Sequence, residues 1–321
     1  MGKIVLVACT NVGRAIIEEV YNNENIKSEI VGVVNLNAHV ALGKANYDSY
    51  LDLGAKYGKG SQECKGKAPL NIHYCQNVND AETLAFIKQC EPDIIIQSGW
   101  SQKFKEELLN LPKYVCIGEH PAPLPRGRGA ACVNWAILTG ETNWGDSFFH
   151  MVDKYDAGEV YAQNYFDIIE DDNVYTVYEK VAAVASKAVR ENVDKWCSGQ
   201  FESIELDEST ATYYGKRCPA DGEIKTFDLP VDKLHDFIRA QTFPYPGAYI
   251  EKELSDGKTH KIILVSSKIK HGMHVDNNPG TFFKSDTKSP GIFVACAAGG
   301  VLEILRVKVD DNPTGWAAEV F

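Results

Sequence analysis

The chain has 321 residues, of which 44% are hydrophobic and 24% are charged, a globular composition that excludes a disordered, collagen-like or coiled-coil chain. Asp and Glu outnumber Lys and Arg by 44 to 33, so we expect no nucleic-acid partner, because an acidic surface repels phosphates. The longest apolar runs fall far short of the roughly 20 residues that a membrane helix needs, and we expect no membrane partner. The nine cysteines form no C-x-x-C pair. This pattern and the absence of a signal leader favour a reducing, cytoplasmic location.

The first two hundred residues alternate between short apolar runs, which predict strands, and helical spacing of apolar residues. In chain order the predicted elements are strand 3–9, helix 12–21, strand 30–34, helix 79–89, strand 93–97, helix 102–111, strand 114–118, helix 132–138, strands 147–152 and 159–166, and helix 173–196. This order predicts a Rossmann-like parallel sheet with helices on both faces. Ligands of such sheets bind at the carboxyl ends of the strands, so we expect the chemistry at residues 98–102 and 118–130.

The pattern changes after a polar, acidic segment at 203–212, which we predict to be a linker. Beyond it the sequence predicts one helix at 231–241 and short strands at 248–253, 261–267, 280–283, 291–297 and 302–309. Short strands separated by turn residues predict a small, mainly antiparallel, OB-like β-barrel. We therefore expect a catalytic domain at 1–202 and a barrel domain at 213–321. The barrel domain has 14 acidic and 14 basic residues, so it is neutral.

The segment CIGEHPAPLPRGRG at 116–129 contains the strongest functional signals. His120 ends a predicted strand and precedes a loop that three prolines stiffen and that glycines open to close approach by a ligand. Arg126 and Arg128 can grip a phosphate or a carboxylate, although a solvated loop explains them equally well. The loop after the first strand has only Gly13, whereas a dinucleotide fingerprint needs three glycines, which argues against hydride transfer.

Asp156 is the second candidate, in an Asp-Ala-Gly turn between two predicted strands. Plain turn chemistry is the alternative interpretation. A carboxylate beside an imidazole raises the pKa of the histidine and fixes its tautomer, so we predict that Asp156 pairs with His120. The eight histidines show no H-E-x-x-H or comparable spacing, and we expect no metal.

At these residues the sequence resembles the folate-dependent formyltransferases. The likeness is greatest to the sugar-nucleotide N-formyltransferases, of the type that acts on UDP-4-amino-4-deoxy-L-arabinose, and smaller to methionyl-tRNA formyltransferase. It covers almost the whole chain and includes the separation of 36 positions between His120 and Asp156. The shared motifs are Leu124-Pro125, Arg128-Gly129, Asn134-Trp135, Gly140-Glu141-Thr142, Met151-Val152 and Asp156-Ala157-Gly158, then Arg217-Cys218-Pro219-Ala220-Asp221-Gly222 and Pro244-Tyr245-Pro246-Gly247-Ala248.

The resemblance implies transfer of a formyl group from 10-formyltetrahydrofolate to the primary amine of an amino-sugar nucleotide, making a formamido sugar for surface glycans. It implies that His120 stabilises the oxyanion and that Asp156 takes the proton of the amine. The implied folate contacts are Gln97, Ser98, Gly99, Trp100, Met151, Val152, Asp153, Lys154 and Tyr155, and the implied acceptor contacts are Pro121, Arg126, Arg128 and Asn134. The family also implies pairing into a homodimer.

Gly118 departs from the family pattern, because the family usually has Asn two residues before the histidine. That Asn donates a hydrogen bond to the formyl oxygen, and the loss of one oxyanion donor costs about 10²–10³ in rate. Glu119 points to the opposite face of the strand. Three interpretations remain open. Another donor replaces the Asn, with Gln97, Ser98 or Asn134 as candidates; the geometry of the site differs; or the protein does not transfer formyl groups.

Two alternatives to the sugar-nucleotide enzyme remain. The first is methionyl-tRNA formyltransferase, for which a basic second domain and a basic insertion after the second strand are expected. Here the second domain is neutral, and residues 35–50 contain a single lysine, Lys44. The second is a folate- or nucleotide-binding module with impaired catalysis, which Gly118 favours.

Overall fold

The computed structural model describes residues 1–38, 40, 50–59, 61, 68–284, 291–310 and 312–320. The chain forms two compact units. The first combines Met1–Cys132, Asn143–Asp167 and Tyr178–Gly215, and the second combines Val133–Thr142, Ile168–Val177 and Lys216–Phe321. Two segments that we placed in the catalytic domain from the sequence, 133–142 and 168–177, thus belong to the second unit.

A seven-stranded sheet forms the centre of the first unit, in the order β3-β2-β1-β4-β5-β7-β8. The pairs from β3 to β5 are parallel, whereas β5 with β7 and β7 with β8 are antiparallel. This mostly parallel sheet confirms the predicted Rossmann-like class, to which it adds two antiparallel strands, β7 and β8, at one edge. The hydrophobic pattern carries no information on strand direction, and antiparallel edge strands are common on such sheets. The strands are β1 (Lys3–Ala8), β2 (Glu29–Leu36), β3 (Ile72–Cys75), β4 (Ile94–Ser98), β5 (Val115–His120), β7 (Asn143–His150) and β8 (Val160–Asp167).

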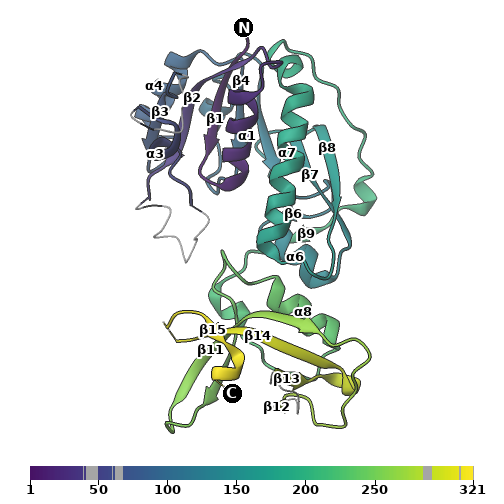
Figure 1. Cartoon of the computed structure of the whole chain (residues 1–321). Coiled ribbons are helices and arrows are strands. Elements are labelled where there is room, and N and C mark those ends of the chain that lie inside the picture. The colour runs from purple at the N-terminus through teal and green to yellow at the C-terminus, as the bar shows by residue number, and fades with distance from the viewer. Residues whose placement is uncertain are drawn as a thin grey trace. The chain divides into compact units, whose positions relative to one another are not determined.

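Helices cover both faces of this sheet, and α1 and α7 run side by side on one of them (Figure 1). The backbone of α1 approaches the sheet closely where Gly13 meets Ala8. The neighbouring residue Val7 points to the other face, where Ile87 of α4 and Leu108 of α5 join it in one buried cluster. The described helices of this unit are α1 (Asn11–Asn22), α3 (Leu53–Tyr57), α4 (Ala81–Cys90), α5 (Glu106–Leu109) and α7 (Val174–Cys197), of which the first turn belongs to the second unit. Helix α6 (Cys132–Thr139) belongs almost entirely to the second unit.

The segment 203–212, which we predicted to be a linker, instead packs on the first unit. The N–H of Ile204 donates to the carbonyl of Val160 at 2.8 Å, and the carbonyl of Thr212 accepts from the N–H of Arg128 at 3.0 Å. The short helix η2 (Glu208–Thr210) lies within it, and β9 (Tyr213–Tyr214), which follows, pairs with β6 (Arg128–Gly129). Its polar groups, which suggested a solvated connection, are used in hydrogen bonds to the loop after β5.

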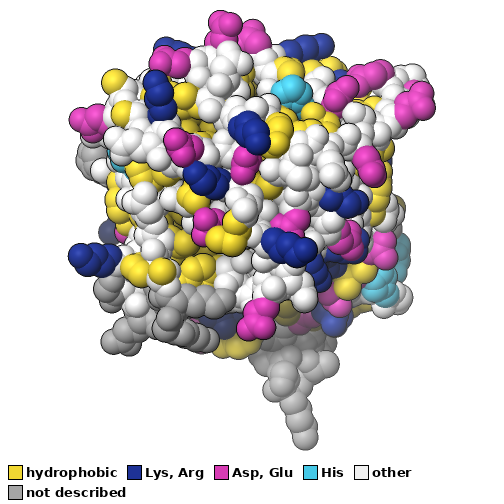
Figure 2. Space-filling view, turned by 90° about the horizontal axis from the view of Figure 1, so that it is seen from above, with side chains coloured by type: hydrophobic (Ala, Val, Ile, Leu, Met, Phe, Trp, Pro, Cys, Tyr) yellow, Lys and Arg dark blue, Asp and Glu magenta, His cyan; other side chains and the backbone are white. Residues whose placement is uncertain are grey.

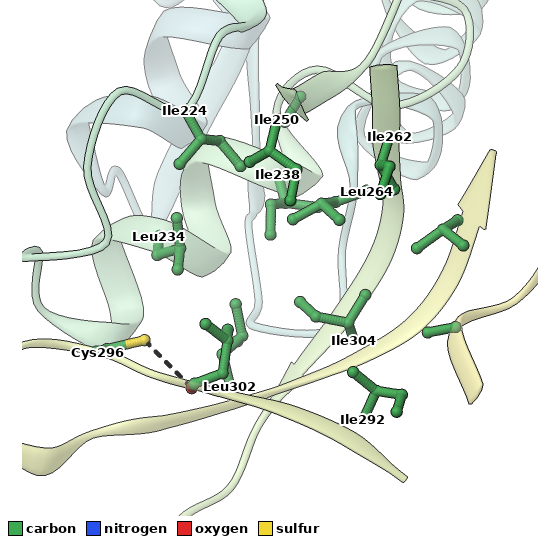
Figure 3. Packing of buried hydrophobic residues seen from close by; sticks show 14 of the residues in the cluster. Ile224, Leu234, Ile238, Ile250, Ile262, Leu264, Ile292, Cys296, Leu302 and Ile304 are labelled. Atoms are coloured by element: carbon green, nitrogen blue, oxygen red, sulfur yellow. Dashed lines mark hydrogen bonds between the residues drawn. The ribbon is translucent and has the colours of Figure 1, made fainter. Parts of the chain in front are cut away.

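The second unit is an antiparallel half-barrel, as predicted from the short strands. Its sheet has the order β10-β11-β14-β13-β12, and β15 pairs with β14. Leu234 and Ile238 of α8 share one buried cluster with strand residues such as Ile262, Leu264 and Ile304 (Figure 3). The elements are η3 (Pro219–Gly222), α8 (Val231–Arg239), β10 (Ala248–Glu253), β11 (Thr259–Ile269), β12 (Phe282–Lys284), β13 (Ile292–Ala295), η4 (Ala297–Gly299), β14 (Val301–Val309), β15 (Gly315–Trp316) and η5 (Ala317–Glu319).

Charged side chains of both signs are interspersed on the face of the molecule shown in Figure 2. The acidic excess is therefore dispersed on that face rather than gathered into one patch. Lys44, the single lysine of the segment after the second strand, lies outside the described residues. Within the part of the chain that the structure describes, no helix combines the length and the apolar character needed to cross a bilayer.

Candidate active site

His120 is the last residue of β5, at the carboxyl edge of the sheet. The residue is 8% exposed, and its Nε2 lies 2.8 Å from the carbonyl oxygen of Gly127. The strand thus ends in an imidazole that the following loop folds back to hold. This fixed orientation leaves Nδ1 as the ring nitrogen that faces Asp156.

Asp156 lies in the turn between β7 and β8 and has a left-handed backbone, with φ of 50°, a conformation that Asp adopts more readily than most residues. Arg128 Nε donates to its carbonyl at 2.7 Å. The N–H of Gly129 donates to its Oδ2 at 2.9 Å. The loop after β5 therefore orients both the backbone and the carboxylate of Asp156.

The structure brings His120 and Asp156 together, with 3.9 Å between Nδ1 and Oδ1. This distance exceeds a hydrogen bond, so direct proton transfer between them requires a small closure or a bridging atom; catalytic contacts are often long without substrate. Burial disfavours the charged imidazole, but the sulfur of Cys132, the carboxylate of Asp156 and the carbonyl of Gly127 outweigh it. Together they raise the pKa of His120 to about 10, so the ring is an imidazolium at neutral pH.

A pocket that is open to solvent adjoins Asp156. It collects Gln97 and Trp100 at the end of β4 and the segment that follows β7. Of the nine residues for which the sequence predicts folate contacts, seven line it, and Ser98 and Gly99 do not. The lining residues are Gln97, Trp100, Ser101, Gln102, Lys103, Phe104, Leu109, Phe149, Met151, Val152, Asp153, Lys154, Tyr155 and Asp156.

Position 118, where the family pattern has an amide, is closed by the packing of the strand next to it. A Cβ atom on Gly118 would lie 2.7 Å from two ring carbons of Phe149 and 3.1 Å from Cγ of Met151. Real Cβ atoms essentially never approach other atoms as closely as the 2.7 Å to Phe149, and the 3.1 Å to Met151 is also tighter than most real Cβ contacts. Gly118 is therefore required by the close approach of Phe149, and β5 offers no side-chain donor two residues before His120.

The residues for which the sequence predicts acceptor contacts are in different places. Arg128 is 3% exposed and makes two hydrogen bonds of 2.8 Å to Glu208, in addition to holding the Asp156 carbonyl. Arg126 stacks over the ring of Trp144, 5.7 Å from its centroid, and the carbonyl of Pro121 accepts from that indole at 2.8 Å.

Asn134, the fourth residue of that set, belongs to the second unit. It is 1% exposed, and its amide nitrogen donates to the carbonyl of Ala240 at 2.6 Å. One of its two amide N–H groups is therefore used within the second unit.

A buried pair of carboxyl groups, which we did not predict, lies on the other face of β5. The hydroxyl of Ser98 donates to Oε2 of Glu119 at 2.6 Å, and the Glu119 carboxyl lies against that of Asp146. Burial raises the pKa of both carboxyls, which favours their protonated forms. The sequence signal for this pair was the presence of acidic residues inside strands that are otherwise buried. The alternation of side chains along β5 had already placed Glu119 on the face opposite His120.

Among the described residues, no group of three His, Cys, Asp or Glu side chains is arranged to hold a metal ion.

The family model described as formyl transferase matches residues 3–193, more than half of the chain. The chain belongs to this family, and it is a formyltransferase-family enzyme. Its fold is similar to that of WlaRD, "a sugar 3N-formyl transferase in the presence of dTdp and 5-N-Formyl-THF", with a TM-score of 0.66, 13% identity, and coverage of 98% of this chain and 99% of that one.

Two further solved structures have the same fold. An N-formyltransferase from Helicobacter canadensis, in complex with folinic acid and dTDP-3-aminofucose, gives a TM-score of 0.66 at 13% identity, with coverage of 95% and 99%. HypX from Aquifex aeolicus, in complex with tetrahydrofolic acid, gives 0.65 at 15% identity and covers 98% of this chain. This chain spans 46% of the HypX chain.

Proposed function

We propose that this enzyme transfers a formyl group from 10-formyltetrahydrofolate to the primary amine of a sugar nucleotide. The observation that carries the proposal is the meeting of His120 and Asp156 at the carboxyl edge of the sheet, beside a pocket lined by 151–155. Structural neighbours that bind a folate together with a nucleotide or an amino-sugar nucleotide support it. The neutral second domain favours such an acceptor over tRNA, because phosphate contacts dominate RNA affinity.

In the proposed reaction the amine nitrogen attacks the formyl carbon, and negative charge develops on the formyl oxygen. The cationic ring of His120 stabilises that charge. Asp156, which lines the pocket, takes the proton that the amine loses, directly or through water. The bond from the carbon to the folate nitrogen then breaks, that nitrogen gains a proton, and tetrahydrofolate leaves.

The test is an assay with 10-formyltetrahydrofolate and a panel of UDP-, dTDP- and CMP-linked amino sugars, with formylated product measured by mass spectrometry. We expect His120→Ala and Asp156→Asn each to lower turnover by about two to four orders of magnitude, the scale of a general acid–base group. His271→Ala and Asp276→Asn, at exposed positions of the second unit, are matched controls that should leave turnover unchanged. Near-normal turnover in a folded His120 or Asp156 variant would contradict these roles.

A second candidate function, folate binding without transfer, is favoured by the closed position at Gly118. Tetrahydrofolate binding with no formylated product from any amine of the panel would support it. Salt-sensitive binding of initiator tRNA would instead overturn the choice of acceptor.

A further inference from the structure

The proposed reaction needs a hydrogen-bond donor at the formyl oxygen in addition to the imidazolium. Oxyanion donors act when they are already in place where the charge develops. The donor has to lie beside the pocket and near His120, on the same face of the sheet. The identity of this donor, which rests on the proposed function, can be read from the strands beside His120.

Strand register places one amide in that position. Gln97 of β4 pairs with Gly118 of β5, and Gly118 pairs with Phe149 of β7. Paired residues point to the same face of a sheet, and alternation places His120, two residues after Gly118, on that face as well. Since Gly118 has no side chain and Phe149 is a hydrocarbon, Gln97 is the nearest side chain of this row that can donate.

The other two donors that the sequence suggested, one hydroxyl and one amide, already make hydrogen bonds elsewhere. The hydroxyl of Ser98 donates to Glu119 on the opposite face, and the amide of Asn134 donates within the second unit. Gln102 also lines the pocket, but its amide nitrogen donates to the carbonyl of Gln76 at 2.8 Å. None of these donors can turn to a ligand without breaking a well-formed hydrogen bond.

The amide of Gln97 is held differently. The residue is 9% exposed and lines the pocket, and its Nε2 makes a long hydrogen bond of 3.4 Å to the carbonyl of Trp100. A hydrogen bond of this length is near the limit for N–H···O geometry, so re-aiming the amide costs little. A buried, weakly held donor that faces a pocket is suited to a ligand oxygen.

We propose that the side-chain amide of Gln97 is a catalytic group that donates to the formyl oxygen, supplying from β4 the donor that β5 lacks at Gly118. As the amine lone pair forms the new carbon–nitrogen bond, the carbonyl π electrons move to the oxygen that Gln97 contacts. When the carbonyl re-forms, the electron pair of the breaking bond stays on the folate nitrogen, which takes a proton in place of the one the amine gives up.

The first test measures turnover of Gln97→Met, which keeps the length of the side chain and removes the donor. We expect kcat to fall about 10²–10³-fold while binding of tetrahydrofolate, which has no formyl group, changes less than about threefold. Gln89→Met, at an exposed position of α4, is the matched control and should keep full turnover. Thermal melts establish that both variants are folded.

The second test needs no transfer reaction. Binding of 10-formyl-5,8-dideazafolate, a stable formylated analogue, is compared with binding of the same compound without its formyl group. We expect the wild-type protein to prefer the formylated compound by about 2- to 10-fold, the scale of one hydrogen bond, and Gln97→Met to lose this preference.

The outcomes separate the two proposals. A wild-type enzyme that forms product, together with a Gln97→Met variant of unchanged kcat and unchanged preference, overturns the role of Gln97 and leaves the proposed function standing. A wild-type protein that forms no product but loses its preference in Gln97→Met overturns the proposed function and supports the contact. A wild-type protein with neither activity nor preference overturns both.

Discussion

The substitution Gly118→Ala tests how firmly Phe149 closes the position beside His120. The added methyl would lie 2.7 Å from two ring carbons of Phe149, about 1 Å inside the normal separation of carbon atoms. Phe149 is 5% exposed and packs with Leu124 and Val160, so a shift of its ring away from the added methyl would disrupt these buried contacts. Overpacking of this kind costs about 1–3 kcal/mol, and the lower entropy of an unfolded alanine offsets about 0.5–1 kcal/mol.

The difference spans about 0–2.5 kcal/mol, and we expect Gly118→Ala to fall in the middle of this range, lowering the free energy of unfolding by about 1–2 kcal/mol. That loss corresponds to roughly 2–8 °C in melting temperature. The assay is urea unfolding followed by tryptophan fluorescence, with wild type and variant compared at equal m-value. Gly215→Ala is the control, because a Cβ there meets nothing within 4 Å, and its effect should stay within about 0.5 kcal/mol.

A double-variant cycle identifies the clash as the cause. Phe149→Leu alone should cost about 1–2 kcal/mol through lost apolar contact. In the double variant the new methyl fills part of the vacated space, so the combined loss should be smaller than the sum by at least about 0.5 kcal/mol. If Gly118→Ala unfolds at the wild-type urea concentration, the ring yields and the reasoning that position 118 is closed is refuted.

Two further predictions follow from the protonation states. Burial raises the pKa of the Glu119 carboxyl, so above about pH 4 the folded chain keeps a proton that the unfolded chain releases. Between about pH 4 and the raised pKa, this carboxyl therefore lowers the stability of the folded chain more and more as the pH rises. Melting temperatures from pH 4 to pH 9 should therefore fall less in Glu119→Gln than in wild type, and parallel curves would contradict the argument. His120, with a pKa of about 10, should remain an imidazolium at pH 8 by ¹⁵N NMR of the ring, and Asp156→Asn should lower its titration midpoint; an unchanged midpoint would mean that the carboxylate does not act on the ring.

The hydrophobic pattern was enough for most of the fold, but not where tertiary contacts override it. The predicted helix at 102–111 is reduced to Glu106–Leu109. The N–H of Val78 donates to Oε1 of Gln102 at 2.8 Å, and the segment before α5 lines the pocket. The short strand Ile72–Cys75 was not predicted, because four residues give too few positions for a period to be recognised.

The candidate site divides in the same way. The pairing of His120 with Asp156 was predictable because each residue stands at a strand end or turn with a recognisable motif. The position of the Phe149 ring over Gly118 was not predictable, because it depends on the register between β5 and β7. The hydrogen bonds of Arg128 to Glu208 were hidden for a different reason: 80 positions separate the partners, and a segment of linker-like composition carries Glu208.

The geometry of two neighbouring strands then decides where the formyl oxygen must lie in the proposed reaction. Register with Gly118 places the Cα of Gln97 one strand across and two residues before His120, so these Cα atoms are about 8 Å apart. Side chains that rise from the same face can converge across that span on one oxygen, with hydrogen bonds of about 2.9 Å from each.

This placement assigns opposite tasks to the polar groups of the site. An imidazolium with a pKa of about 10 cannot take the amine proton at neutral pH, so in the proposed reaction His120 would act as a donor together with Gln97. The proton acceptor has to be another group, and Asp156 is the carboxylate that both lines the pocket and faces the ring. Loss of Asp156 should therefore impair the attack of the amine, whereas loss of Gln97 should impair stabilisation of the oxyanion. Only the Asp156 variant should regain turnover as rising pH supplies hydroxide to take the proton.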